Sequence, residues 1–247
     1  MRRSIDINCD MGEGCGNDAA LMPYISSANI SCGYHAGDAA TMRETIELAA
    51  RHGVAVGAHP SYRDRENFGR TDVELSAAEL RTLILEQLEI FAGACREIGV
   101  TISHVKPHGA LYNRSARDAA VARTIAEAVL EFDAGLTLYG LAQSHSTEEA
   151  RKLGLKAADE AFADRAYEPD GSLVSRRKQN ALINSPEIAA AQALHIALGG
   201  GVVAIDGSNV QLSAETICVH GDGPNAAAIA RTIRSAFELA GVVIKAP

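Results

Sequence analysis

Imidazole, carboxylate and lysine side chains recur in short segments of this sequence, each placed just after a predicted strand. The segments are residues 8–14, 35–38, 59–61, 106–109 and 220–223. Carboxylates and imidazoles are the groups that most often transfer protons near neutral pH. The carboxyl ends of parallel strands lie on one side of a sheet, where the following loops form the site. We therefore expect these groups to meet on one face of the molecule.

Almost every predicted strand end contributes to this set. The groups singled out by position are Asn8, Asp10, Glu13, His35, Asp38, His59, Lys106, His108, Glu160, Arg165, His220 and Asp222. Isolated histidines in loops and helices are more often structural than catalytic, and we interpret His52, His145 and His195 in that way. Repeated placement at equivalent strand ends instead favours a shared function.

Asp10, His35 and His59 come from consecutive predicted strands and form a possible ligand set for a divalent metal. The alternative is a metal-free cluster in which carboxylates set the tautomers and pKa values of the histidines. Spacing alone leaves both open, and we favour the metal-free cluster.

The cysteines beside strand ends fit buried apolar positions better than nucleophiles. The sequence contains no Walker motif and no strand-coupled GxGxxG, so it holds no conventional nucleotide site.

Short apolar segments alternate with helical ones along the whole chain. The predicted strands are residues 4–8, 28–32, 54–58, 102–106, 136–139, 156–161 and 216–220. Capping boxes are predicted at Ser76 with Glu79 and at Ser146 with Glu149. Pro186 suits the first turn of another helix, and the last helix is expected over residues 224–240.

Strict alternation of strands and helices predicts an α/β fold with parallel strands joined by right-handed crossovers. Seven strands can close into a barrel or remain an open doubly wound sheet, and spacing does not separate the two. We expect a single domain over residues 1–247, since no linker or repeat interrupts the chain. The polar stretch 163–179 after a strand is expected to be a binding loop or lid.

Composition narrows the function classes. The net charge of −8 argues against nucleic acid as a partner, because binding phosphates needs clustered Lys and Arg. No apolar run approaches the ~20 residues that cross a bilayer, and the start lacks a signal-like apolar stretch. The five cysteines are odd in number and contain no CxxC pair. We therefore expect a cytoplasmic protein with reduced thiols and no membrane partner.

Several longer motifs together resemble the LamB/YcsF family across essentially the whole chain. They are DINCDMGEG (6–14), SSANISCGYHAGD (26–38), GAHPSY (57–62), VKPHGALYN (105–113), DEAFADR (159–165), GSLVSR (171–176) and CVHGD (218–222). Cys9 and Met11 are mild departures from the small or aliphatic residues expected there. The resemblance implies a seven-stranded parallel (β/α) barrel of the glycoside hydrolase/deacetylase type. It also implies an ATP-dependent hydrolase that opens the lactam of 5-oxo-L-proline to L-glutamate, shared with partner subunits B and C.

With that activity, ATP would be a co-substrate carried with Mg²⁺, no tightly bound cofactor is expected, and a homo-oligomer is possible. Catalytic roles would fall to Asp10, Glu13, His35, His59, His108 and Glu160. Substrate or phosphate binding would fall to Asn8, Lys106, Arg165, Arg176, His220 and Asp222. Two alternatives stay open: a stand-alone metal-dependent deacetylase or amidohydrolase, and a non-catalytic substrate-binding subunit.

Overall fold

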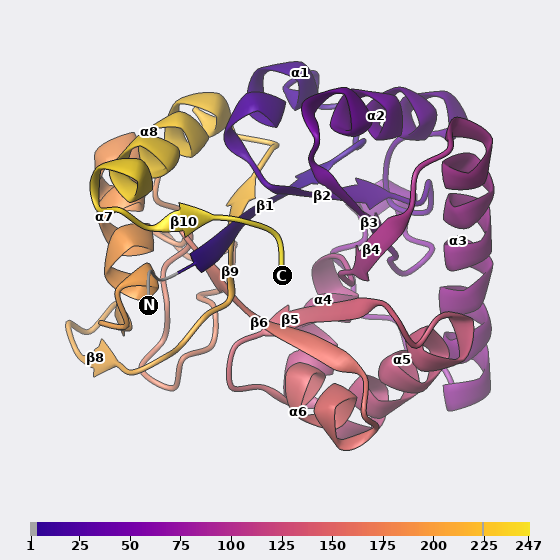
Figure 1. Cartoon of the computed structure of the whole chain (residues 1–247). Coiled ribbons are helices and arrows are strands. Elements are labelled where there is room, and N and C mark those ends of the chain that lie inside the picture. The colour runs from indigo at the N-terminus through magenta and orange to yellow at the C-terminus, as the bar shows by residue number, and fades with distance from the viewer. Residues whose placement is uncertain (1–3, 224) are drawn as a thin grey trace.

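Seven parallel strands form a closed ring with helices packed around it (Figure 1). The computed structural model describes residues 4–223 and 225–247. The barrel strands are β1 (Ser4–Met11), β2 (Ser27–Ser31), β3 (Ala55–His59), β4 (Ile102–Val105), β5 (Thr137–Leu141), β6 (Lys156–Phe162) and β9 (Thr216–His220). Each pairs with its predecessor, and β9 pairs with both β6 and β1, which closes the ring. The predicted barrel is therefore confirmed, and the open sheet is excluded.

Alternation along β1 shows how the sequence specifies this barrel. Ile5, Ile7, Cys9 and Met11 belong to the apolar core. The residues between them, Asp6, Asn8 and Asp10, are buried polar groups that contact strands across the ring. Successive side chains of a strand point to opposite faces. One face of β1 therefore packs on the helices while the other lines a polar barrel interior.

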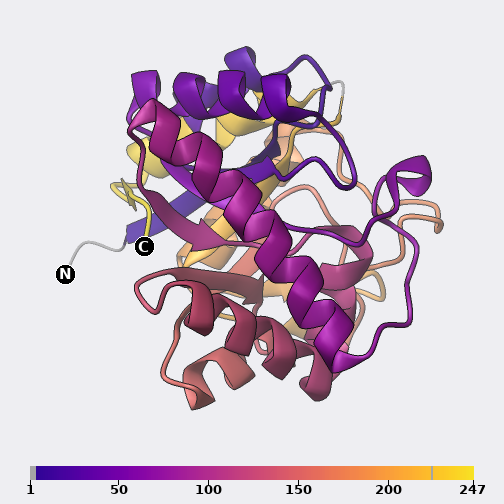
Figure 2. The ribbon, with the colours of Figure 1, turned by 90° about the vertical axis from the view of Figure 1, so that its right-hand side faces the viewer.

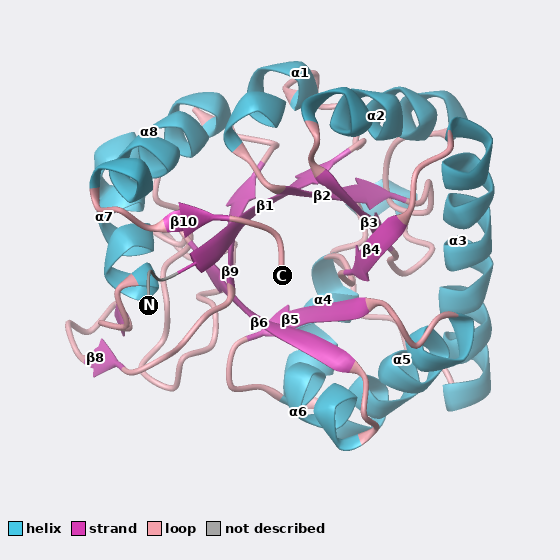
Figure 3. Ribbon diagram, viewed as in Figure 1, coloured by secondary structure: helices cyan, strands magenta, loops and turns pink. Residues whose placement is uncertain are grey.

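Eight helices and three short strands complete the fold (Figure 3). The helices are α1 (Asp18–Leu21), α2 (Ala39–His52), α3 (Ala77–Ile98), α4 (Gly109–Arg117), α5 (Ala119–Phe132), α6 (His145–Lys152), α7 (Pro186–Ala197) and α8 (Ala226–Leu239). The 3₁₀ turns are η1 (Met22–Tyr24) and η2 (Arg65–Asn67), and the short strands are β7 (Val202–Val203), β8 (Asn209–Val210) and β10 (Val243–Ile244). These counts refer to the part of the chain that the structure describes.

Helix ends follow the predicted chemistry in most places. Ser76 and Glu79 form the predicted capping box at the start of α3, and Gly99 ends that helix in the left-handed conformation. Figure 2 shows α3 lying along the outside of the barrel. Ser185 caps α7, with Pro186 in its first turn. The predicted start of the last helix at Pro224 lies outside the described residues.

The predicted capping box at Ser146 is wrong. Helix α6 begins one residue earlier, at His145, and Ser144 is its N-cap. The Ser146 hydroxyl is buried instead, 2.7 Å from the hydroxyl of Ser115.

The strand and helix patterns also did not indicate α4 and α5, or β10, which pairs with the start of β1. Within the described residues, no helix is long and apolar enough to cross a membrane.

Candidate active site

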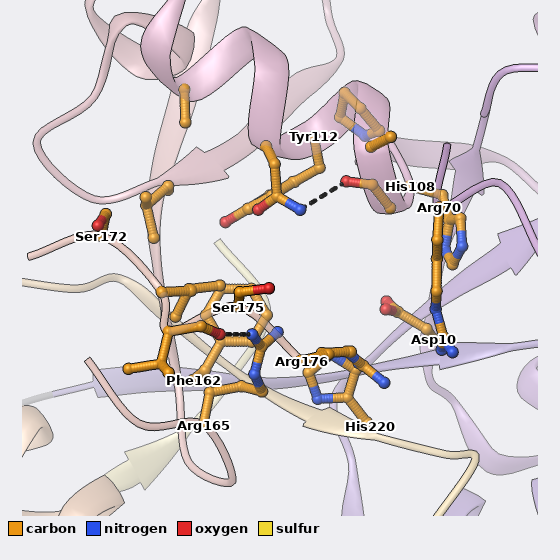
Figure 4. Close-up of a pocket in the computed structure, with 18 of the residues that line it drawn as sticks. Asp10, Arg70, His108, Tyr112, Phe162, Arg165, Ser172, Ser175, Arg176 and His220 are labelled. Atoms are coloured by element: carbon orange, nitrogen blue, oxygen red, sulfur yellow. Dashed lines mark hydrogen bonds between the residues drawn. The ribbon is translucent and has the colours of Figure 1, made fainter. Parts of the chain in front are cut away.

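A cavity of about 780 Å³ opens at the carboxyl ends of the barrel strands (Figure 4). Its walls come from residues that follow β1, β3, β4, β5, β6 and β9, together with helix α4. The long segment after β6 contributes residues 170–177, as the polar composition of that segment predicted. A volume of this size accommodates a small organic substrate with room for a further group.

Lys106 lies at the inner end of this cavity, and its ammonium is almost completely enclosed. Its Nζ lies 2.9 Å from Oδ1 of Asp10, 2.8 Å from Oε1 of Glu160 and 3.1 Å from Sγ of Cys218. Burial opposes the charge, but the carboxylates of Asp10 and Glu160 outweigh it and hold the pKa of Lys106 well above its ordinary value. Lys106 is therefore a buried cation whose donors are engaged within the protein.

Asp10 is the carboxylate that lines the cavity beside this lysine. Burial would raise its pKa, but His59 and Lys106 lower it well below the usual range. Nε2 of His59 lies 3.5 Å from Oδ2 of Asp10, and Asn29 donates to Oδ1 at 2.8 Å. Asp10 is thus held as a carboxylate between two basic groups.

A polar network inside the barrel supports these side chains. Asn8 accepts from Asn29 and Lys106, at 2.7 and 3.2 Å, and donates to Glu160 at 2.8 Å. His104 stacks on Tyr139 and places its Nε2 2.8 Å from Oδ1 of Asn29. Burial lowers the pKa of His104 to about 3, so this ring is neutral. The network fixes the orientation of Asp10 and Lys106.

Three histidines and Glu13 lie together beside Asp10. The ligand atoms of Glu13, His35, His59 and His108 lie within 4.8 Å of one another. Nδ1 of His108 lies 2.9 Å from Nε2 of His59, and Nε2 of His35 lies 3.1 Å from Oε1 of Glu13. Asp10 belongs to a second group, with Cys218 and His220. The possible metal set of Asp10, His35 and His59 is therefore divided between two groups.

The ring geometry bears on whether these histidines could share an ion. The rings of His35 and His108 are parallel, with an interplanar angle of 6° and centroids 3.8 Å apart. Imidazole binds a metal through a lone pair in the ring plane, so two stacked rings cannot both aim at one ion. The outer nitrogens of His59 and His108 face the carbonyls of Lys106 and Phe68, which only accept hydrogen bonds. One proton shared between Nε2 of His59 and Nδ1 of His108 lets one nitrogen donate and the other accept, so every ring nitrogen of the two residues has a hydrogen-bond partner.

His220 occupies the end of β9 and contacts Asp164. Its Nδ1 lies 2.8 Å from Oδ1 of Asp164, and its backbone N–H donates to the same carboxylate. Burial would raise the pKa of Asp164, but His220 outweighs this effect and lowers it. Asp164 therefore fixes the His220 ring against the cavity wall.

The predicted site residues are largely brought together. Those that line the cavity are Asp10, Glu13, His59, Lys106, His108, Arg165, Arg176, His220 and Asp222. Asn8, His35 and Glu160 contact these residues from behind and are not part of the cavity lining. Asp38 instead caps helix α2.

Sequence reasoning missed four groups of this site. Asn29 and His104 lie inside strands, where only their position on the same face as Asn8 or Lys106 could have identified them. Arg70 and Tyr112 line the cavity from a loop and from α4, and no strand end marks them. The Tyr112 hydroxyl and Oε2 of Glu160 are buried without a hydrogen-bond partner among the described residues.

The closed ring of parallel strands with helices around it defines a parallel (β/α) barrel with a polar cavity at one end. The family 4 carbohydrate esterase from Streptomyces lividans matches with a TM-score of 0.54 and 14% identity, covering 98% of this chain and 91% of that one. At such low identity, the likeness shows the fold alone.

Sequence similarity identifies the family. The LamB/YcsF family model matches residues 5–247. The A subunit of 5-oxoprolinase from Tolumonas auensis is 48% identical over 247 residues, which covers 98% of each chain. The crystal structure of the lactam utilization protein from Thermus thermophilus matches with a TM-score of 0.92 and 43% identity, covering 99% of this chain and 100% of that one. The chain belongs to the LamB/YcsF family.

Proposed function

We propose that this protein is the A subunit of an ATP-dependent 5-oxoprolinase. The reaction opens the lactam of 5-oxo-L-proline to L-glutamate and hydrolyses ATP to ADP and phosphate, with B and C subunits as partners. The observation that carries the proposal is the cavity wall where the carboxylate Asp10 lies beside Lys106 and His59. The name of the Tolumonas auensis relative supports the choice of reaction.

Chemistry explains why such a hydrolase would use ATP. A lactam is a planar amide and a poor electrophile, and phosphorylation of its oxygen makes the ring carbon easier for water to attack. The ring nitrogen then needs a proton when the C–N bond breaks. This cleavage leaves an acyl phosphate, and a second water hydrolyses it to the carboxylate of glutamate and inorganic phosphate. Mg²⁺ carried with ATP would balance the charge of the phosphates.

The residues of the cavity wall suit the steps that follow. Asp10 would orient the attacking water, and Lys106 keeps that carboxylate ionised. The hydrogen-bonded pair of His59 and His108 would supply the proton to the ring nitrogen. Arg165 would hold anionic groups of the bound reactants, because its side chain lines the same cavity. Glu160 would act only through Lys106.

The test measures glutamate and ADP release from 5-oxo-L-proline and ATP. The chain is assayed alone and then mixed with candidate B and C subunits. We expect coupled release only in the mixture. Release of glutamate by the chain alone and without ATP would replace the proposal with a stand-alone amidohydrolase. Full activity of B and C without this chain would leave it no catalytic role.

A further inference from the structure

Arginine side chains reach the cavity from separate segments of the chain. Arg70 follows η2, Arg165 follows β6, and Arg176 lies in the long segment between β6 and α7. Figure 4 shows Arg70, Arg165 and Arg176 among the side chains that line the cavity. Guanidinium groups brought together in this way repel one another unless an anion lies between them.

One side chain of the protein supplies an anion to two of these arginines. Oδ2 of Asp222 lies 2.7 Å from Nη2 of Arg70 and 3.4 Å from Nη1 of Arg176. A single carboxylate oxygen therefore contacts guanidinium groups from two distant segments. All three side chains are partly exposed, so the ion pairs can open at modest cost.

Arg165 is a second, independent observation that points to an anionic ligand in this cavity. The residue is 6% exposed, and its Nε has no hydrogen-bond partner among the described residues. Its Nη2 donates to the carbonyl of Val174 at 2.6 Å. Burial lowers the pKa of Arg165 to about 10, so the group is still charged at neutral pH. A buried guanidinium with an unused donor is costly unless a ligand completes it.

We propose that Arg70, Arg165 and Arg176 form a binding site for a phosphoryl group, and that Asp222 occupies this site as an internal substitute until the ligand arrives. A planar carboxylate is matched by one guanidinium fork, whereas a phosphoryl dianion offers three oxygens and a charge that suits several. Binding moves the Asp222 carboxylate away from the two arginines. The ligand is inorganic phosphate or the terminal phosphate of a nucleotide.

The choice of ligand rests on the proposed function, but binding itself needs no turnover. Asp222 competes with the ligand, so its removal has the opposite effect to removal of an arginine. Asp222→Asn keeps the shape of the side chain and takes away the charge. We expect it to tighten phosphate binding by roughly 3- to 10-fold, because two partly exposed ion pairs no longer have to open.

The experiment is isothermal titration calorimetry on the full chain with inorganic phosphate, ADP, ATP and 5-oxo-L-proline as separate ligands. Arg176→Ala and Arg70→Ala should weaken phosphate binding by roughly 10-fold or more. Asp133→Asn, an exposed aspartate outside the cavity, is the matched control and should leave binding unchanged. Stronger binding of ATP or ADP than of free phosphate would identify the nucleotide as the source. Thermal melting verifies that each variant folds, and Arg70→Ala, at a partly exposed position, is the variant least expected to disturb the core.

Opposite results overturn the inference. Unchanged or weaker phosphate binding in Asp222→Asn would mean that this carboxylate does not compete. A gain confined to 5-oxo-L-proline would assign the site to a carboxylate instead. Failure of coupled glutamate release would reject the proposed function while leaving these phosphate titrations valid, so the two proposals fail separately.

Discussion

Lys106 and Asp10 form an enclosed ion pair, with Nζ and Oδ1 2.9 Å apart and the lysine side chain 2% exposed. Lys106 also contacts Glu160, which is completely buried. Removal of one partner from a buried ion pair leaves an uncompensated charge. The pair therefore contributes to the fold as well as to the site.

Lys106→Met should lower the free energy of unfolding by about 3–5 kcal/mol, because Asp10 and Glu160 lose their shared cation. Urea unfolding measures this change. Lys152→Met is the control, since Lys152 is half exposed and its surface ion pairs are worth at most about 1 kcal/mol. Equal losses in the two variants would contradict the structural role given to Lys106.

Asp10→Asn should lower kcat of the proposed 5-oxoprolinase complex by roughly 10²–10⁴-fold, the range for loss of a group that handles protons or water. The asparagine oxygen can still accept from Lys106 and Asn29, so the site keeps its shape. Steady-state release of glutamate is the readout. A kcat within a few-fold of wild type would remove Asp10 from the mechanism.

Asp164 should make stability depend on pH. Its pKa is lower in the folded protein than in the unfolded chain, since His220 outweighs the effect of burial. Its stabilising contribution is therefore complete above the unfolded value of about 3.9 and is lost as the pH falls through the folded value. Urea unfolding from about pH 6 down to about pH 2 should show a steeper loss for wild type than for Asp164→Asn. Parallel curves would show that Asp164 has no such linkage.

Gly57→Ala should destabilise the barrel by about 1–3 kcal/mol, because the added Cβ would collide with the ring of His104. The His104 ring stacks on Tyr139 and cannot move away freely. Urea unfolding tests this against Gly93→Ala, where the new Cβ meets no atom within 4 Å. Gly93 lies within α3, so that substitution should stabilise the protein by up to about 1 kcal/mol. A neutral Gly57→Ala would mean that the His104 ring is loosely held.

The sequence predicted the barrel strands and the face that carries the polar groups. The alternation of apolar and polar residues in β1, and the polar residues that follow the strands, are local patterns. They can be recognised in the sequence without any knowledge of the fold. Glu160 shows what these local patterns do not predict. Glu160 lies within the predicted strand 156–161, and in the structure it contacts Lys106 inside the barrel, behind the cavity wall. Whether a residue near a strand end lines the cavity or lies beneath it depends on the strands across the ring, and spacing does not show these.

The spacing of residues in the sequence could not predict contacts between distant segments. Arg70 and Asp222 are 152 residues apart, and only the closed ring brings their loops together. His104 lies within a predicted strand, where a histidine is normally a structural residue. Ser146 matched a capping pattern, yet its hydroxyl instead contacts Ser115 on α4. Tertiary packing decided each of these cases.

The pairing of β1 with β9 and β10 has a consequence for synthesis of the chain. The first strand can be complete while its last two neighbours, which begin at Thr216 and Val243, are still untranslated. Until then the edges of β1 and β6 have no β9 between them, and the Asp6 carboxylate lacks the Thr216 hydroxyl. Figure 1 shows β10 beside the start of β1, with which it pairs. Barrel closure is therefore possible only after β9 has been made, and until then the edges of β1 and β6 are open to pairing with other strands.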